Sequence, residues 1–369
     1  MVRVCYYEAF FRNVNIGFQT IICKMSNCTV TGATGFIGSQ LVRKLLENGE
    51  TVRCLVRSSS KLDRLNGLDV EIKETDFSDS ESLKSGIAGA DIVFHCAGCI
   101  KSLRKEEMYQ TNCENTKRLA QACADSDAAP RFMYISSLAA GGPMKGKNAP
   151  LREEWMTENP VSVYGKSKLA AEKELRKISP NLPISIIRPP MVLGSADKCS
   201  LLMFKAIQNS GLHCCPGWER KRYTVVVDSD VVDTLILAAE KGTRLTDCTE
   251  SGNPENSYQS GIYYVARDEH PEYGELGKLI GEKLGRKWTI SWHFSSPVFW
   301  TVSVIIDSIF RLGGRTSILN LDKATEAIAG NWICSNEKAK RELGLTVTGD
   351  LPTLIEDIVA GYRAQGWLK

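Results

Sequence analysis

The chain lacks the features that would mark it as a nucleic-acid-binding or membrane-spanning protein. Its formal net charge is only +3 over 369 residues, which is too small to indicate an anionic macromolecular partner. No run of residues reaches the ~20 apolar positions that a membrane span needs. The longest candidate, 297–310, is interrupted by Asp307. We therefore interpret it as a packed helix that lines a pocket or touches a membrane surface.

The cysteines also lack the pattern of a disulfide scaffold or a metal site. There are thirteen of them, an odd number without framework spacing, which is typical of reduced thiols in a cytoplasmic protein. The tightest groups of metal-ligating residues lie at 95–99 and 213–215. Neither has a second CxxC or HxxxH pair at the spacing of a zinc site, so we predict no metal.

Residues 1–24 lack the apolar central run and the cleavage site of a secretory signal. Met25 is followed at once by a strand pattern, so we expect the working protein to begin there, with 1–24 outside the fold.

From residue 27 onward, short β-branched runs alternate with longer segments of helical period. This alternation predicts a doubly wound parallel α/β sheet of the Rossmann type. We expect 25–195 to form the dinucleotide-binding domain, with 225–245 returning to it, and 196–224 and 246–369 to form a smaller substrate-binding α/β cap. The predicted strands are 28–31, 51–56, 70–73, 91–95, 132–135 and 184–187, and the clearest helices are 37–48, 105–126 and 163–178.

A glycine-rich turn stands between the first predicted strand and the first predicted helix. Its sequence, TGATGFIG over 31–38, places glycines where a tight turn, close approach of a pyrophosphate and close helix packing need them. Free amides at the start of a helix then bind phosphate oxygens. We predict that a dinucleotide contacts Gly32, Thr34, Gly35, Phe36, Ile37 and Gly38.

The end of the second strand bears on which dinucleotide is bound. NAD-binding proteins usually carry an acidic residue there, which accepts hydrogen bonds from the ribose. This chain has Arg57, and a guanidinium can bind a 2′-phosphate through two hydrogen bonds. NADP(H) is therefore favoured over NAD(H), although NAD(H) stays open. The alternative interpretation of Arg57 is a solvated basic residue at the start of a helix that binds no phosphate.

A second group of residues can carry acid–base chemistry. Tyr164 and Lys168 share one face of a predicted helix. A tyrosine ionises near pH 10 unless a nearby cation stabilises the phenolate, and Lys168 supplies that cation. Ser136 and Ser137 follow the predicted strand 132–135, and a hydroxyl there could hydrogen-bond a substrate oxygen.

Together these motifs resemble the extended short-chain dehydrogenase/reductase family, in its NAD-dependent epimerase/dehydratase group. The resemblance runs from about residue 27 to the C-terminus. The motifs that carry it are TGATGFIG, Asp76-Phe77, His95–Gly98, Asn112 with its neighbours, Ser137, YGKSK at 164–168 and RPPMVLG at 188–194.

The resemblance implies a catalytic triad of Ser137, Tyr164 and Lys168, with Ser136 as the weaker alternative to Ser137 and with Tyr164 and Lys168 also contacting the cofactor. It implies a structural role for Asn112, with a proton relay as the alternative. It also implies further cofactor contacts: Asp76 and Phe77 at the adenine, Ala97 and Gly98 at the ribose and phosphates, and Pro189 and Val192 along the nicotinamide.

Three functions stay open at this point. Arg57 and the aromatic residues of 288–300 favour an oxidoreductase acting on a secondary alcohol or ketone, resembling dihydroflavonol reductases and 3β-hydroxysteroid dehydrogenases. The alternatives are a nucleotide-sugar epimerase or dehydratase with tightly held NAD, and a non-catalytic dinucleotide-binding protein. We expect a small-molecule substrate, no nucleic acid, no membrane span, a cytoplasmic location and compatibility with a homodimer.

Overall fold

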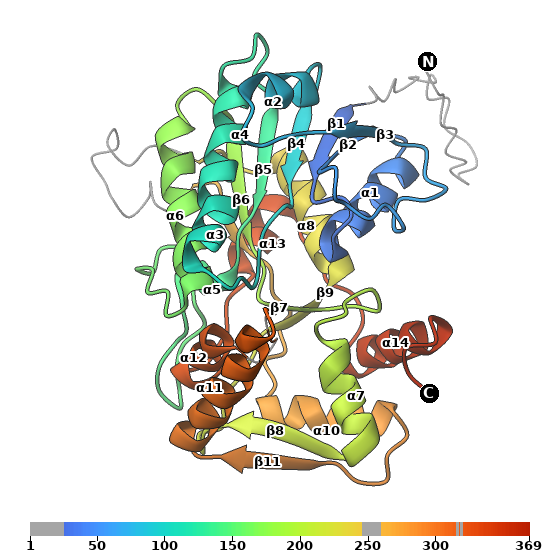
Figure 1. The fold of residues 1–369 in the computed structure, drawn as a ribbon, viewed down its shortest axis with the longest axis vertical. Helices are drawn as coiled ribbons and strands as arrows, with labels where there is room; N and C mark the ends of the chain where they lie inside the picture. The colour runs from blue at the N-terminus through green and yellow to red at the C-terminus, as the bar shows by residue number, and fades with distance from the viewer. Residues whose placement is uncertain (1–25, 246–259, 315–316, 318–319) are drawn as a thin grey trace, which may run out of the picture.

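A computed structural model of the protein describes residues 26–245, 260–314, 317 and 320–369. Seven parallel strands form its large sheet, in the order β10-β6-β5-β4-β1-β2-β3 (Figure 1). The chain moves outward from β1 through β2 to β3, and then returns to the other side of β1 with β4. These strands are β1 (Asn27–Thr31), β2 (Thr51–Val56), β3 (Glu71–Glu74), β4 (Ile92–His95), β5 (Arg131–Ile135), β6 (Ile184–Arg188) and β10 (Ile262–Tyr264).

Helices cover both faces of this sheet, and each face has its own apolar core. On one face lie α1 (Phe36–Glu47), α8 (Asp228–Lys241) and α13 (Glu337–Leu343). On the other lie α2 (Ser80–Ile87), α4 (Asn115–Ala124) and α6 (Val163–Ile178). The central strands consist mainly of apolar residues because they are buried on both sides. The predicted doubly wound α/β fold is confirmed.

A smaller part, which we call the cap, hangs below the carboxyl ends of the large sheet (Figure 1). Two further strand pairs are parallel: β8 with β11 in the cap, and β7 with β9 between the cap and the large sheet. The strands are β7 (Met191–Leu193), β8 (Leu212–Pro216), β9 (Val225–Val227) and β11 (Ile290–Phe294). The cap helices are α7 (Leu201–Ser210), α10 (Tyr273–Lys283), α11 (Ser296–Leu312) and α12 (Leu321–Ala329), and α14 (Leu351–Ala364) packs beside them.

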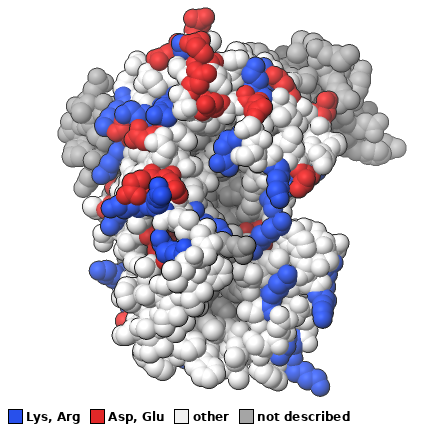
Figure 2. All heavy atoms as spheres, in the orientation of Figure 1, with Lys and Arg blue, Asp and Glu red and all other residues white. Residues whose placement is uncertain are grey.

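The outer face of α11 is apolar and exposed. Val302, Ile305 and Ile309 lie on one side of the helix and are each between 45% and 61% exposed. Figure 2 shows that the lower left of the molecule in this view, where α11 lies, carries few charged side chains. No helix among the described residues is long and apolar enough to cross a membrane.

Two elements differ from the sequence-based expectation. Within the segment 246–369, expected in the cap, β10 pairs with β6 at the edge of the large sheet, and α13 packs against α8. Helix 105–126 is divided into α3 (Lys105–Tyr109), a π-helical turn (Gln110–Glu114) and α4. The expected N-terminal extension, 1–24, lies outside the described residues. Within the described ranges the ten cysteines are unbridged, and no group of three or more potential ligands could hold a metal ion.

Candidate active site

The predicted site residues gather at the carboxyl ends of the central strands. The sheet order reverses between β1 and β4, so the loops after these two strands leave the sheet in opposite directions. In open α/β sheets this reversal opens a crevice at the strand ends, where ligands bind. Thr31 and His95 end the two strands that border the crevice, and Ile135 ends the next strand along.

The loop after β1 is shaped by glycines that tolerate no side chain. Gly32 has a φ of 67°, and a Cβ there would lie 2.6 Å from the backbone nitrogen of Ala97. A Cβ on Gly38 would lie 2.2 Å from the carbonyl oxygen of Gly32. Gly35 provides the N-cap of α1 without a side-chain cap, so the first-turn amides keep their hydrogen-bonding capacity for a ligand. These features fit the pyrophosphate of a dinucleotide.

The ends of β2 and β3 carry the residues predicted to reach the adenosine part. Arg57 follows β2 directly and is exposed, and its backbone amide donates to Ser60 Oγ over 3.1 Å. Asp76 follows β3, and its carboxylate accepts two hydrogen bonds from Ser78, which lower its pKa. Phe77 lies 6.2 Å from the His95 ring. Arg64, also near the end of β2, donates instead to the carbonyl oxygen of Ala196.

The structure brings Ser137 and Tyr164 together through a close contact between two helices. Ser137 caps the short helix α5 (Leu138–Gly141) and accepts from the amide of Ala139 over 3.1 Å. Gly165 follows Tyr164 in α6, and a Cβ there would lie 2.3 Å from the carbonyl oxygen of Ala139. The glycine in the YGKSK motif therefore lets α6 approach α5. Sequence reasoning used Tyr164 and Lys168 but gave this glycine no role.

The adjacent serine points elsewhere. Ser136 hydrogen-bonds Glu172, which also forms a buried ion pair with Arg188 over 2.5 Å. Tyr264 and Glu158 complete the partners of Arg188. Ser136 is thus part of a closed network behind the site, whereas the Ser137 side chain lies beside Tyr164 and lowers its pKa.

Lys168 is buried one helical turn after Tyr164 in α6. Its amine donates to the carbonyl oxygen of Ile135 over 2.8 Å and lies 4.8 Å from the centre of the Tyr134 ring. Burial lowers the pKa of Lys168 to about 8, although the charge of Glu172 opposes this. A Cβ on Gly98 would lie 3.1 Å from the amine, so Lys168 reaches the loop that follows β4.

Two polar residues fix the loop after β4. The Asn112 side chain bonds the backbone of Cys99 through both its oxygen and its nitrogen, and it also donates to Ser167. These bonds support the structural role expected for Asn112, and they occur in the π-helical turn, a feature frequent at functional sites. His95 lies between the hydroxyls of Thr31 and Thr116. Burial lowers the pKa of His95 to about 3, so its ring is neutral.

The remaining predicted residues follow β6 and border the cap. Pro189 is buried, and its carbonyl oxygen accepts from the amide of Leu138 over 2.8 Å, which joins the ends of β5 and β6. Val192 lies in β7 and is partly exposed. An open cavity of about 580 Å³ adjoins the site next to Cys99. Its lining comprises Cys99, Lys101, Ser102, Leu103, Glu107, Thr111 and Gly314.

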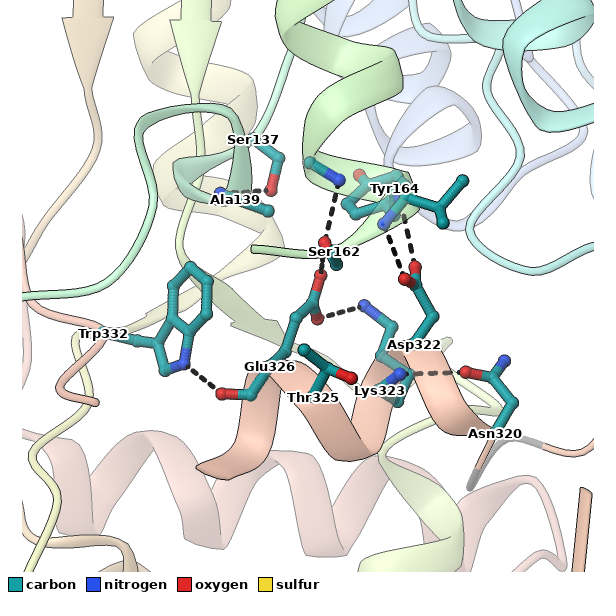
Figure 3. A network of polar contacts seen from close by, with 12 residues as sticks. Ser137, Ala139, Ser162, Tyr164, Asn320, Asp322, Lys323, Thr325, Glu326 and Trp332 are labelled. Carbon is teal, nitrogen blue, oxygen red and sulfur yellow. Dashed lines mark hydrogen bonds and ion pairs between the residues drawn. The ribbon is translucent and has the colours of Figure 1, made fainter. Parts of the chain in front are cut away.

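Helix α12 of the cap packs on the start of α6, and sequence reasoning gave it no role in the site. The Asp322 carboxylate accepts from the amides of Val163 and Tyr164 over 2.6 and 3.0 Å. The Lys323 amine lies 4.8 Å from the centre of the Tyr164 ring. Glu326 accepts from the hydroxyl of Ser162 over 2.6 Å (Figure 3). Sequence patterns could not reveal that this helix belongs to the site, because about 160 residues separate Asp322 from Val163 along the chain.

Comparisons with known proteins agree with this arrangement. The model of the NAD dependent epimerase/dehydratase family matches residues 28–246. The ceramide reductase of Caulobacter vibrioides is 26% identical over 92% of this chain and 95% of its own length. Sterol demethylase protein B of Methylococcus capsulatus is 28% identical over 92% and 99%. A Synechocystis protein named as a dihydroflavonol 4-reductase is 36% identical over 47% of this chain and 51% of its own length.

Solved structures show the same fold at lower identity. The crystal structure of gox2253 has a TM-score of 0.72 and 24% identity, covering 93% of this chain and 100% of its own. UDP-glucose 4-epimerase of Thermotoga maritima, solved with UDP-glucose, has a TM-score of 0.70 and 21% identity over 92% and 99%. UDP-glucuronic acid 4-epimerase of Bacillus cereus, solved with NAD, has a TM-score of 0.68 and 18% identity, covering 92% of this chain and 99% of its own.

Proposed function

The chain belongs to the NAD dependent epimerase/dehydratase family, and from that premise we propose that it is an NADP(H)-dependent oxidoreductase that interconverts a secondary alcohol and a ketone. One observation carries this proposal. Ser137 lies beside Tyr164 and lowers its pKa, and Lys168 reaches the end of β5 from one turn further along α6, all at the carboxyl ends of the strands that hold the glycine turn. An acid–base group, an oxygen-binding hydroxyl and a dinucleotide cradle in one crevice suit hydride transfer.

In this mechanism each residue has a separate task. Ser137 hydrogen-bonds the substrate oxygen, and Tyr164 gives a proton to that oxygen during reduction or takes it during oxidation. Burial raises the pKa of Tyr164, so its hydroxyl is protonated at neutral pH and ready to act as the proton donor. When bound, the nicotinamide supplies or accepts the hydride. Lys168 would hold the ribose next to it, since its amine reaches Gly98.

The preference for NADP(H) rests on Arg57. The guanidinium follows β2 and is exposed, so it is free to reach a 2′-phosphate at the edge of the crevice. The residues proposed to hold the dinucleotide are those of the glycine turn, Asp76 and Phe77 after β3, Ala97 and Gly98 after β4, and Pro189 and Val192 after β6. An adenosine without the phosphate would leave Arg57 without this partner.

We further propose that the substrate has a large apolar part. Two relatives that match this chain over nearly their full length are named for a ceramide and a sterol. The outer face of α11 is apolar and exposed as well, and Gly314, two residues after that helix, lines the cavity beside Cys99. A cytoplasmic location is supported by the unbridged cysteines of the described ranges. A homodimer stays a prediction.

Replacement of Tyr164 tests the proposed chemistry. NADPH fluorescence is followed against a panel of apolar ketones, and the reverse reaction against the matching alcohols. We expect Tyr164→Phe to lower kcat by at least about a hundred-fold, the usual contribution of a general acid, while NADPH affinity changes little. Tyr109→Phe, a partly exposed tyrosine at the end of α3, is the matched control. Wild-type turnover by Tyr164→Phe would overturn the mechanism.

The second candidate function is a nucleotide-sugar epimerase or dehydratase. The family name favours it, and the structural neighbours include epimerases solved with UDP-sugars. A dehydratase needs an acidic pair beside the triad, but Leu138, Ala139 and Ala140 follow Ser137 here. The two functions differ in how the cofactor is held. NAD that co-purifies with the protein and is reduced and reoxidised in each cycle would favour the epimerase or dehydratase.

A further inference from the structure

Helix α12 is anchored on the first turn of α6, where Tyr164 lies. Asp322 accepts both free amides of that turn, at Val163 and Tyr164. Such carboxylate–amide bonds at a helix N-terminus are charge-assisted and are also favoured by the helix dipole. Figure 3 shows Asp322, Lys323 and Glu326 of α12 pointing toward the start of α6. Helix α12 thus brings charged side chains to the start of α6 that do not come from the large sheet.

Two of these side chains form a connected pair next to the tyrosine. Lys323 Nζ lies 2.7 Å from Glu326 Oε2 and 4.8 Å from the centre of the Tyr164 ring. Glu326 Oε1 accepts from Ser162, whose hydroxyl also caps α6 by accepting from the amide of Gly165 over 2.9 Å. The ammonium is therefore held over the ring by a carboxylate that is itself fixed to α6.

Lys168, the cation expected to act on the tyrosine, is directed elsewhere in this structure. Its amine bonds Ile135 and lies over Tyr134 in β5. Lys323 approaches the Tyr164 ring from α12 in the cap. The site therefore has two lysines, a buried one on α6 and one on α12.

We infer that Lys323 is a positioning residue that stabilises the Tyr164 phenolate from the cap, and that the negative charge of Glu326 opposes this effect. The inference rests on the proposed role of Tyr164 as the acid–base group. According to this inference, the active site is complete only when α12 is docked on α6. The large sheet and its own triad would then hold the cofactor, while the cap would supply the charge that adjusts the tyrosine.

The electrostatics around Tyr164 agree with this geometry. Burial is the largest effect and raises the pKa of Tyr164; Lys323 lowers that pKa, Glu326 raises it, the Ser137 hydrogen bond lowers it and Cys99 raises it. Burial disfavours the charge on Lys323, but Glu326 and Tyr164 outweigh it and raise the pKa of Lys323. The other titratable groups around Tyr164 are Asp322 on α12, which accepts from its backbone amide, and Tyr134 in β5, whose pKa Tyr164 helps to raise; Lys168 on α6 lies over Tyr134.

The test changes the two charges of α12 separately. We would label the protein with 3-fluorotyrosine, which ionises at lower pH than tyrosine, and follow each phenol by ¹⁹F NMR as the pH is varied. The Tyr164 resonance is assigned by its loss in Tyr164→Phe. Lys323→Met should move the Tyr164 midpoint to higher pH, and Glu326→Gln should move it to lower pH. Lys323→Arg should leave it near the wild-type value. Lys166→Met, an exposed lysine of α6 with the same change of charge, is the control.

In alcohol oxidation the same variants should move the ascending limb of the kcat–pH profile in the same two directions. At a fixed pH on that ascending limb, the rates of Lys323→Met and Glu326→Gln should differ by roughly ten-fold or more. This difference corresponds to midpoints about one pH unit or more apart. Shifts of the same sign in both variants, or no shift in either, would overturn the inference and leave α12 a packing element. The NMR midpoints need no substrate. A wild-type protein without oxidoreductase activity would therefore contradict the proposed function alone.

Discussion

Replacing Lys168 by methionine should stabilise the protein while abolishing its activity. Burial lowers the pKa of this amine to about 8 from an ordinary value of 10.5. At about 1.4 kcal/mol per pH unit, this difference amounts to roughly 3 kcal/mol of free energy by which the charged amine destabilises the folded protein at pH 7. Methionine carries no charge, but it loses the hydrogen bond to Ile135, which is worth about 1 kcal/mol. We expect a net gain of about 2 kcal/mol.

The gain should depend on pH in a defined way. Below pH 8 the amine is charged in the folded and the unfolded protein, so the unfavourable term is fully present. Between about 8 and 10.5 the folded protein has already released the proton while the unfolded protein still holds it. The contribution of Lys168 to the free energy of unfolding therefore rises with pH across this window. Above 10.5 both states are neutral, and the advantage of Lys168→Met should have disappeared.

Urea unfolding of the cofactor-free wild type and of Lys168→Met, at pH 7 and at several values up to pH 10.5, measures this difference. Taking the difference between the two proteins cancels the other groups that titrate in the range. Lys166→Met, two residues away on the exposed side of α6, should show no such pH dependence. A Lys168→Met protein that is less stable at pH 7, or a difference that does not change with pH, would refute the account of a destabilised active-site lysine.

Two further changes test the glycine turn and the frame of the large sheet. Gly38→Ala should weaken NADPH binding at least about ten-fold in a fluorescence titration, because its Cβ would lie 2.2 Å from the carbonyl oxygen of Gly32. Unchanged affinity would show that α1 can shift without harm. Gly313→Ala at the end of α11 is the control. Asp230→Asn should lower the free energy of unfolding by about 3 kcal/mol, because it leaves the buried Arg267 of a two-bond ion pair uncompensated. Glu81→Gln, in an exposed pair, should change it by less than about 0.5 kcal/mol, and equal effects of the two would contradict the role of burial.

The fold was predictable wherever the signal is local. Each predicted strand from 28–31 to 184–187 lies within one residue of an observed strand, because buried parallel strands are short apolar runs bounded by turns. The glycine turn was predictable for the same reason: the strand, the turn and the helix are contiguous. The strand β10 was not predicted, because three residues, Ile262–Tyr264, are too short a signal until β6 offers them an edge.

The site was predictable in part. Tyr164 and Lys168 are one helical turn apart, so their common face follows from their spacing. The sequence favoured Ser137 over Ser136 only by resemblance, and the network of Glu172 gives the physical reason, since it engages Ser136. Lys323 and Glu326 carried no signal. Their relation to Tyr164 depends on how the cap docks, and only the folded chain brings them together.

The measurement that most directly tests the central claim is a titration of the purified protein with NADPH and with NADH, for the wild type and for Arg57→Ala. Absorbance of the fresh preparation is checked first for bound nucleotide. We predict an empty protein that binds NADPH at least about ten-fold more tightly than NADH, and an Arg57→Ala variant in which that preference is lost. Co-purified NAD, or a wild-type preference for NADH, would contradict the account and favour a nucleotide-sugar epimerase or dehydratase.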